Sequence, residues 1–158
     1  MNKRTRESMT SSKKQNWLTP KALFETYNQV YNFTTDICTN EANHLGTPLF
    51  FTEKDDGLAN YNKWQGNIWC NPPYSESDRW VEGCSRYASE GKGVAVMLIA
   101  SRTETDRFHR YIWDTKDQRP KDNVVVHFLK GRIKFLNAET GQPNDPAFFG
   151  SMIVIFRR

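Results

Sequence analysis

The chain has 158 residues, of which 37% are hydrophobic and 25% charged, as expected of one ordinary globular domain. Its longest apolar run, residues 94–100, is far too short to span a bilayer, and its polar start has no apolar signal core, so we expect neither membrane insertion nor secretion. Three cysteines without a Cys-x-x-Cys pair and three scattered histidines favour the reducing cytoplasm and no structural metal.

The net charge of +4 is concentrated at the start of the chain. Residues 1–16 contain five lysines and arginines against a single acid, Glu7, and so account for the whole excess. We therefore expect a flexible basic arm, 1–16, followed by one neutral domain, 17–158. Such an arm suits a polyanion, although a solubilising tail without a partner fits the composition equally well.

The first predicted helix covers residues 21–31, where apolar side chains recur at helical spacing. Thr19 and Pro20 precede it and can cap and open a helix. Turn residues at 55–57 and 71–74 then separate short apolar segments. These segments predict strands at 33–38, 48–52 and 66–70, and a brief helix at 40–45.

A second long helix is predicted after this point, because residues 75–78 can cap it and the following apolar side chains share one face before Gly91. Residues 93–100 form a continuous apolar strand of the kind that parallel sheets bury under helices on both faces. The remaining predicted elements are a helix at 104–114 and strands at 124–128, 132–135 and 151–156. This alternation of strands and helices predicts an α/β fold.

The chemistry is concentrated in the turn Asn71-Pro72-Pro73-Tyr74, which follows the strand at 66–70. Open α/β sheets bind ligands at the carboxyl ends of their strands, so this is where an active site is expected. The side-chain carbonyl of Asn71 and the backbone carbonyl of Pro72 can together accept both hydrogens of an exocyclic amine. The Tyr74 ring can stack on a planar base taken out of a duplex. The alternative is an ordinary rigid turn with a tyrosine beside it.

Several short motifs in the same order resemble those of the phage-type DNA N6-adenine methyltransferases, the phage Dam-like family. They lie at 17–20 (Trp-x-Thr-Pro), 36–38, 56–58 with Trp64, 69–75 (the Asn-Pro-Pro-Tyr-Ser core), 102–105 and 131–135. The resemblance implies a Rossmann-like methyltransferase fold that depends on S-adenosylmethionine. Its sheet would be mostly parallel with one antiparallel strand near the edge, and helices would cover both faces. It also implies a phage or prophage enzyme of the host bacterial cytoplasm that methylates the N6 amine of adenine in double-stranded DNA.

The sequence departs from methyltransferases at large at the expected cofactor site, because no Gly-rich loop follows Asp36. S-adenosylmethionine carries an ammonium and a sulfonium rather than a pyrophosphate, so carboxylates and carbonyls can bind it without glycines. We expect Asp36 to contact its methionine end and Asp56 its ribose or adenine amine. Capping of the local turn is the alternative for each acid. Thr19 and Pro20 are expected to close over the cofactor, and Trp17 either to contact it or to pack.

DNA phosphates and bases call for cations with several donors. The candidates are Arg102, Arg107, Arg110, Arg132 and Lys134, together with His109. A solvated charged surface is the alternative for each. The chain between residues 100 and 131 is too short for a separate recognition domain, so a target site of a few base pairs is expected.

Three other functions fit the same turn. An RNA or protein-glutamine methyltransferase could act on another planar group, and a cytosine-N4 enzyme is chemically close. A catalytically inactive DNA-binding relative is the alternative outside the enzymes. In the adenine mechanism the protein orients the reactants for direct transfer, so His44, His109 and His127 are not needed as bases.

Overall fold

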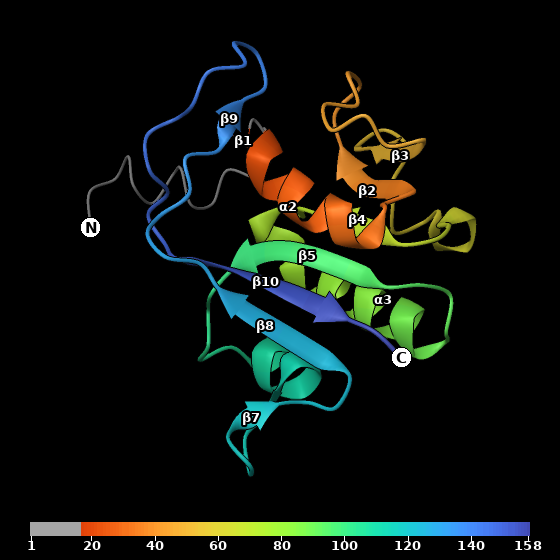
Figure 1. Cartoon of the computed structure of the whole chain (residues 1–158), viewed down its shortest axis with the longest axis vertical. Helices are drawn as coiled ribbons and strands as arrows, with labels where there is room; N and C mark the ends of the chain where they lie inside the picture. The colour runs from red at the N-terminus through yellow and green to blue at the C-terminus, as the bar shows by residue number, and fades with distance from the viewer. Residues whose placement is uncertain (1–16) are drawn as a thin grey trace.

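The computed structural model describes residues 17–158, and the expected basic arm lies outside this range. A six-stranded sheet with the strand order β3-β2-β4-β5-β10-β8 forms its centre (Figure 1). β3, β2, β4 and β5 are parallel, whereas β10 is antiparallel to both β5 and β8. The sheet is therefore mostly parallel, with one antiparallel strand next to its edge, as the sequence motifs suggested. The strands are β2 (Thr35–Thr39), β3 (Leu49–Thr52), β4 (Ile68–Cys70), β5 (Ala95–Ala100), β8 (Val124–Phe128) and β10 (Ser151–Phe156).

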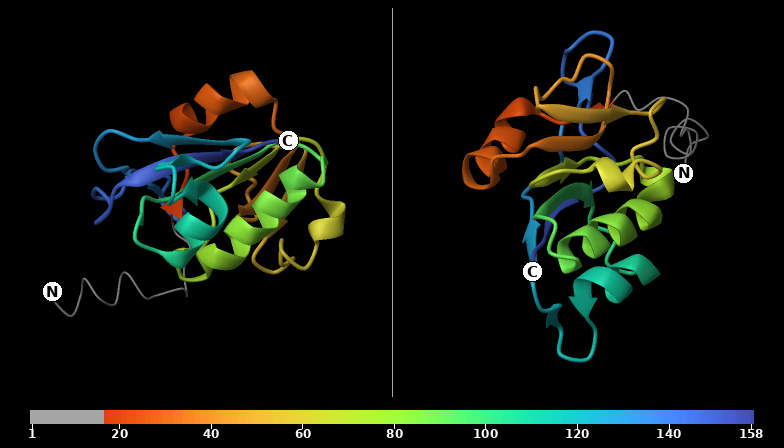
Figure 2. Two further views of the ribbon diagram at one scale, coloured as in Figure 1. Left: turned by 90° about the horizontal axis from the view of Figure 1, so that it is seen from below. Right: turned by 90° about the vertical axis from the view of Figure 1, so that its right-hand side faces the viewer.

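Helices cover both faces of this sheet (Figure 2). On one face lies α2 (Lys21–Tyr31), and on the other lie α3 (Ser77–Ser89) and the short π-helix η3 (Phe108–Ile112). Because side chains alternate along a strand, β5 contributes to two cores. Its Val96 and Leu98 pack with α2, while Met97 and Ile99 pack with α3. All six residues of β5 are buried, as its continuous apolar sequence predicted.

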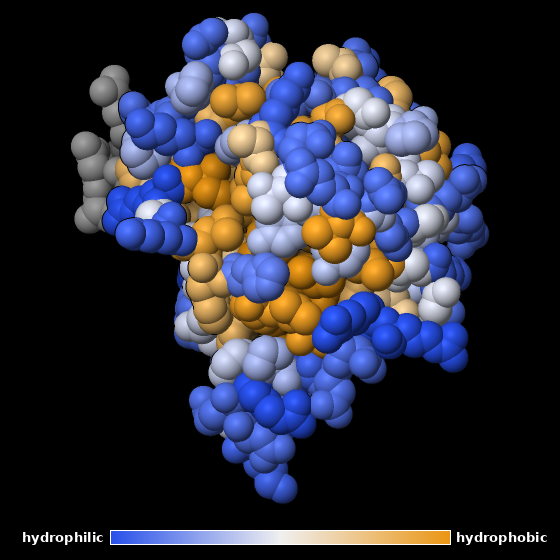
Figure 3. Space-filling view, in the orientation of Figure 1, coloured by the Kyte–Doolittle hydropathy of each residue, from blue (hydrophilic) through white to orange (hydrophobic). Residues whose placement is uncertain are grey.

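Two small antiparallel pairs extend from the main sheet. β1 (Trp17–Leu18) pairs with β9 (Leu136–Asn137), so the start of the described chain lies beside a segment that is more than a hundred residues away in sequence (Figure 1). β6 (Trp113–Asp114) and β7 (Arg119–Pro120) form a hairpin that projects from the body and has a largely hydrophilic surface (Figure 3). The other short elements are the 3-10 helices η1 (Tyr61–Lys63) and η2 (Tyr74–Glu76).

The helix at 21–31 and the strands at 124–128 and 151–156 have the bounds that the sequence predicted. Two other predictions are wrong, and the helix expected at 104–114 is correct only for residues 106–112. Residues 40–45 form two successive turns instead of a helix, with Asn43 in the left-handed region at φ +47°. The helix expected at 104–114 is a short turn of π-helix, because residues 113–114 leave it to pair with β7. Residues 132–135 lie outside any strand, and pairing begins only at Leu136.

The expected caps are also different. Pro20 occupies the N-cap of α2, which has no side-chain cap, and the Thr19 hydroxyl is used elsewhere. Helix α3 begins at Ser77, whose hydroxyl donates to the carbonyl oxygens of Pro73 and Tyr74 instead of accepting from the helix. The serine therefore fastens the preceding turn to the helix.

Within residues 17–158, no helix is long and apolar enough to cross a membrane. The described residues also contain no group of three or more His, Cys, Asp or Glu side chains that could hold a metal ion.

Candidate active site

The carboxyl ends of β2 and β4 form a topological switch point. From β2 the chain moves to β3 on one side, then returns to β4 on the other side and continues to β5. Open α/β sheets bind ligands in the crevice at such a point. Asp36 lies on β2 and Asn71 directly follows β4, so both predicted site residues flank this crevice.

A cavity of about 330 Å³ opens at the switch point, a volume at the lower end of the range for small-molecule sites. Trp17, Thr19, Asp36 and Asn71 all line it, which brings four of the predicted site residues together. A second cavity of about 300 Å³ is lined by Asp56 and Pro73 and shares Cys38, Thr52 and Glu53 with the first. Pro20, Pro72 and Tyr74 line neither cavity.

The Asn71 side chain is held by the N-terminal strand. Its Nδ2 donates to the backbone carbonyl of Trp17 at 3.1 Å and to the Thr19 hydroxyl at 3.2 Å. A carbonyl oxygen can only accept, so the amide end that faces it must be the NH₂ group. Within residues 17–158 both hydrogen bonds of this amide use the nitrogen, which leaves Oδ1 as an available acceptor. Asn71 is only 9% exposed, so its orientation is well fixed.

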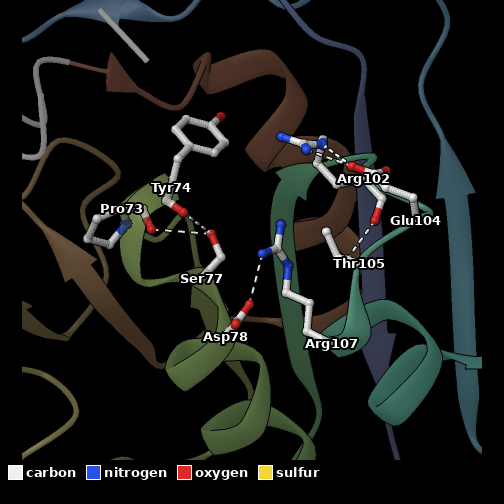
Figure 4. Close-up of polar contacts among 8 residues, drawn as sticks. All are labelled: Pro73, Tyr74, Ser77, Asp78, Arg102, Glu104, Thr105 and Arg107. Carbon is white, nitrogen blue, oxygen red and sulfur yellow. Dashed lines mark hydrogen bonds and ion pairs between the residues drawn. The ribbon is translucent and has the colours of Figure 1, made fainter. Parts of the chain in front are cut away.

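The two prolines place backbone carbonyls next to this amide. The carbonyl of Pro73 is used by the turn, because it accepts from Ser77 Oγ at 3.2 Å (Figure 4). The carbonyl of Pro72 has no hydrogen bond among residues 17–158, although Pro72 is buried. The acceptor pair expected from the sequence, Asn71 Oδ1 and the Pro72 carbonyl, is therefore not occupied by any residue of the described range.

Tyr74 points into an aromatic cluster that the sequence did not predict. Its ring centroid lies 4.6 Å from that of Phe149, 5.3 Å from that of Trp17 and 6.4 Å from that of Phe135. The Tyr74 hydroxyl is buried without a hydrogen-bond partner among the described residues. Burial raises the pKa of this hydroxyl well above its usual value, so it stays neutral. The Tyr74 ring is thus held in place by its contacts with the other aromatic rings. Its hydroxyl adds no hydrogen bond among the described residues.

Asp36 is a buried carboxylate at the wall of the first cavity, only 2% exposed. Burial raises its pKa to about 7, and hydrogen bonds from the Cys38 backbone N–H and the Thr39 side chain offset only part of this effect. No ion pair with Asp36 is found among residues 17–158. The local turn interaction and the cavity wall coexist here, so capping and ligand contact are compatible for this residue.

Asp56 lies on a loop that is held close to β2. Its carboxylate accepts from the backbone N–H of Ala59 at 3.1 Å, and its backbone is left-handed at φ +55°. The next residue must be glycine, because a Cβ on Gly57 would lie 2.1 Å from the carbonyl oxygen of Ile37. Trp64 Nε1 donates to the Gly57 carbonyl at 2.8 Å. Trp64, which the sequence motif groups with residues 56–58, therefore holds this acidic loop in place.

The cations expected to contact DNA follow β5 and β8, at the same edge of the sheet as Asn71. Two of them have acidic partners: Arg102 pairs with Glu104 at 2.6 Å, and Arg107 pairs with Asp78 at 2.8 Å (Figure 4). The Arg110 guanidinium lies 5.5 Å from the centroid of the Tyr111 ring. Arg110, Arg132 and Lys134 are exposed.

The histidines are engaged in hydrogen bonds. His44 bonds to the Thr19 carbonyl at 3.0 Å, His127 to the Tyr27 hydroxyl at 2.9 Å, and His109 to the Thr103 carbonyl at 2.7 Å. His109 therefore braces its own loop with both ring nitrogens.

Sequence reasoning missed two groups of site residues. Phe135 and Phe149 complete the aromatic cluster, and Glu41, Glu53 and Glu139 add acidic side chains to the first cavity. Phe135 belongs to the motif at 131–135, but no local sequence pattern connects it with Tyr74. The acids lie on turns, where charged residues are ordinary and carry no functional pattern.

Known proteins resemble the chain over almost its whole length. A family model described as DNA N-6-adenine-methyltransferase (Dam) matches residues 6–158. The chain is 31% identical over 156 residues to the DNA N-6-adenine-methyltransferase of Haemophilus phage HP1 (strain HP1c1), which covers 96% of this chain and 84% of the relative. It is 23% identical over 148 residues to the protein of the same name from Escherichia phage T1, covering 89% of this chain and 62% of the relative. With these matches added to the geometry of the Asn71 turn, the chain belongs to the DNA N-6-adenine-methyltransferase (Dam) family.

Proposed function

We propose that this protein transfers a methyl group from S-adenosylmethionine to the exocyclic N6 amine of adenine in double-stranded DNA, at a short site, with the target base flipped out of the helix. The observation that carries the proposal is the fixed Asn71 amide, whose free Oδ1 lies at the same crevice as the buried Asp36 carboxylate. The two phage relatives named DNA N-6-adenine-methyltransferase support the same chemistry and a phage or prophage origin. We further infer that the sheet is the Rossmann-like sheet of such methyltransferases, which its switch point supports.

The chemistry of the first cavity fits this cofactor. S-adenosylmethionine supplies an electrophilic methyl group on a positively charged sulfonium and also carries an ammonium. Asp36 is a buried carboxylate without a cationic partner among the described residues, and a cation would stabilise its charged form. Trp17 and Thr19 would form the wall on the side of β1, and Asp56 would accept from the ribose or adenine amine in the adjoining cavity.

Charge is divided along the carboxyl edge of the sheet in a way that suits two different ligands. The first cavity is lined by the acids Asp36, Glu41, Glu53 and Glu139 and by the cation Lys54, which pairs with Glu41 at 2.6 Å, so its lining is acidic on balance. The segments that follow β5 and β8 are basic. A cationic cofactor is attracted to the acidic region and a DNA backbone to the basic one. Each ligand is repelled by the region that has its own sign of charge. The basic residues are Arg102, Arg107, Arg110, Arg132 and Lys134.

The residues of the turn would act by orienting the amine. Asn71 Oδ1 and the Pro72 carbonyl can each accept one N6 hydrogen, which favours a pyramidal and more nucleophilic nitrogen. The same two acceptors stabilise the positive charge that develops on that nitrogen. Because the amide nitrogen of Asn71 is already bonded to Trp17 and Thr19, the acceptor does not have to reorganise during the reaction. The proton released from nitrogen can pass to solvent without a protein base.

Tyr74 would stack on the flipped adenine. Its neutral ring offers an aromatic face. The buried Tyr74 hydroxyl has no hydrogen bond among the described residues, so none would be broken when a base reaches the ring. Since Phe149 and Trp17 now lie against this ring, a base that reaches Tyr74 must replace part of that packing. We therefore place the base slot at this cluster, where an arriving base would replace a tilted or edge contact of Tyr74 with a stacked one.

The proposal is tested by incubating the full chain with unmethylated double-stranded DNA, RNA and protein substrates and a cofactor with a labelled methyl group. Digestion of the labelled DNA to nucleosides should give N6-methyladenosine in its deoxy form, and mapping of the label should give the target site. Asn71→Ala is the control for a contaminating enzyme, because it should abolish the label. Label on N4 of cytosine, or only on RNA or protein, would contradict the proposal, and a folded protein that binds no cofactor would indicate an inactive relative.

A further inference from the structure

Phe148 is an exposed aromatic residue in a segment that is otherwise packed against the protein. It is 54% exposed, whereas its neighbour Ala147 is 7% exposed and Phe149 is half-buried. The segment lies between β9 and β10. The Phe148 side chain therefore lies in solvent and does not pack in either hydrophobic core.

On one side, this segment is attached to the proposed base slot. The ring of Phe149 lies 4.6 Å from that of Tyr74 and 6.1 Å from that of Trp17, measured between centroids. Phe148 is the next residue in the chain, so it lies at the rim of the aromatic cluster that the flipped base would enter.

On the other side, the same segment is bonded to the two basic segments. The carbonyl of Gly150 accepts from the backbone N–H of Ser101 at 2.9 Å, and the N–H of Ala147 donates to the carbonyl of Ile133 at 3.0 Å. These two bonds fix the backbone on both sides of Phe148. They bring it beside the cations Arg102, Arg132 and Lys134, which are adjacent in sequence to the bonded residues.

We propose that Phe148 is the wedge that enters the base stack of the DNA when the target adenine leaves it. This inference rests on the proposed function. A flipped base leaves a gap, and apolar side chains inserted at base steps compensate for the lost stacking. Phe148 combines the three properties that such a residue needs: an exposed apolar ring, a backbone that is held in place, and a position between the base slot and the phosphate-binding cations.

Phe128 supplies a matched control. It is 56% exposed and lies at the end of β8, but no ring contact connects it with the Tyr74 cluster among the described residues. Single exposed apolar side chains are common on protein surfaces. Phe128→Ala therefore removes the same amount of exposed aromatic surface without touching the base slot.

The experiment compares Phe148→Ala, Phe128→Ala and the unsubstituted chain on two unmethylated duplexes. Both carry the target site that the labelling experiment maps. In one the target adenine is paired with thymine, and in the other it faces an abasic position, so that less pairing must be broken before flipping. We expect Phe148→Ala to lower kcat/KM at least about tenfold on the paired duplex and less than about threefold on the abasic one. With 2-aminopurine in place of the target adenine, its fluorescence increase on binding should be reduced by Phe148→Ala and unchanged by Phe128→Ala.

Three results would overturn the wedge. An equal loss on both duplexes would make Phe148 an ordinary DNA contact. A loss no larger than that of Phe128→Ala would make it an ordinary surface residue. If the unsubstituted chain methylated neither duplex, the proposed function itself would fail and the wedge with it. Circular dichroism of each variant distinguishes misfolding from these results. Little misfolding is expected, because both side chains are exposed.

Discussion

Asp36→Asn tests whether this carboxylate binds a cationic cofactor. The substitution keeps an oxygen that can accept from the Cys38 backbone N–H but removes the charge. With a pKa of about 7 in the free protein, about one tenth of Asp36 is ionised at pH 6 and about nine tenths at pH 8. If only the ionised form binds the cation, cofactor affinity should rise about tenfold between these two pH values. The Asn variant should bind about tenfold or more weakly at pH 8, since one charge-assisted hydrogen bond is worth about 1.5 to 3 kcal/mol.

Isothermal titration calorimetry measures both the affinity and the protons exchanged. In two buffers of different ionisation enthalpy, binding at pH 6 should release about 0.9 proton from the native chain. The Asn variant corrects for the titration of the cofactor's own amine and of other protein groups. Burial raises the pKa of the nearby Cys70 thiol well above its usual value, so this group does not titrate in the range. Equal affinities for both chains at pH 8, with no difference in proton release at pH 6, would refute the assignment.

The same carboxylate should also affect stability without ligand. A pKa raised above its unfolded value of about 3.9 means that the folded state holds the proton more tightly. The free energy of unfolding therefore falls as the pH rises from about 4 to about 7, and it is not regained above that range. Asp36→Asn cannot ionise, so the variant should gain stability relative to the native chain between pH 5 and pH 8. Urea unfolding at these two pH values would show a constant difference if burial had not raised the pKa.

Other predictions concern the turn and the arm. Asn71→Ala should lower kcat about 100-fold or more while the folded protein still binds cofactor, because the amide oxygen is needed mainly in the transition state. Tyr74→Phe should keep most of the activity that Tyr74→Ala loses, because the hydroxyl has no partner in the described chain; equal loss in single-turnover assays would contradict stacking. Deleting residues 2–14 removes all five cations of the arm and should flatten the plot of log DNA affinity against log salt by about 0.9 per lost phosphate contact, with cofactor affinity unchanged. An unchanged slope would identify a solubilising tail.

The parts of the fold that the sequence predicted are those with strong local patterns. Helix α2 has one apolar face, and β10 has a continuous apolar sequence, so their side chains determine their structure almost without reference to the rest. The Asn71 turn was also recognisable, because two prolines restrict the backbone regardless of what packs around it. Its position at a strand end then placed the candidate site at the carboxyl edge of the sheet.

The predictions failed where a distant contact replaced a local one. Thr19 is a good capping residue, but its hydroxyl bonds to Asn71 instead of the helix. Residues 113–114 continue a helical pattern, yet they pair with β7. The aromatic cluster joins Trp17, Tyr74, Phe135 and Phe149, which are far apart in sequence. No spacing rule could have brought these rings together, because the β1 and β9 pairing that aligns them is itself long-range.

Trp17 connects the two halves of the proposed site. Its backbone carbonyl accepts from the Asn71 amide, the residue lines the first cavity, and its ring centroid lies 5.3 Å from that of Tyr74. The pairing of β1 with β9 fixes this residue, and its ring stacks on Phe135 at 5.7 Å. A base that entered the slot would therefore press on the same residue that orients the acceptor and borders the cofactor. Under the proposed function, arrival of the base and alignment of the amine would both involve this strand of two residues.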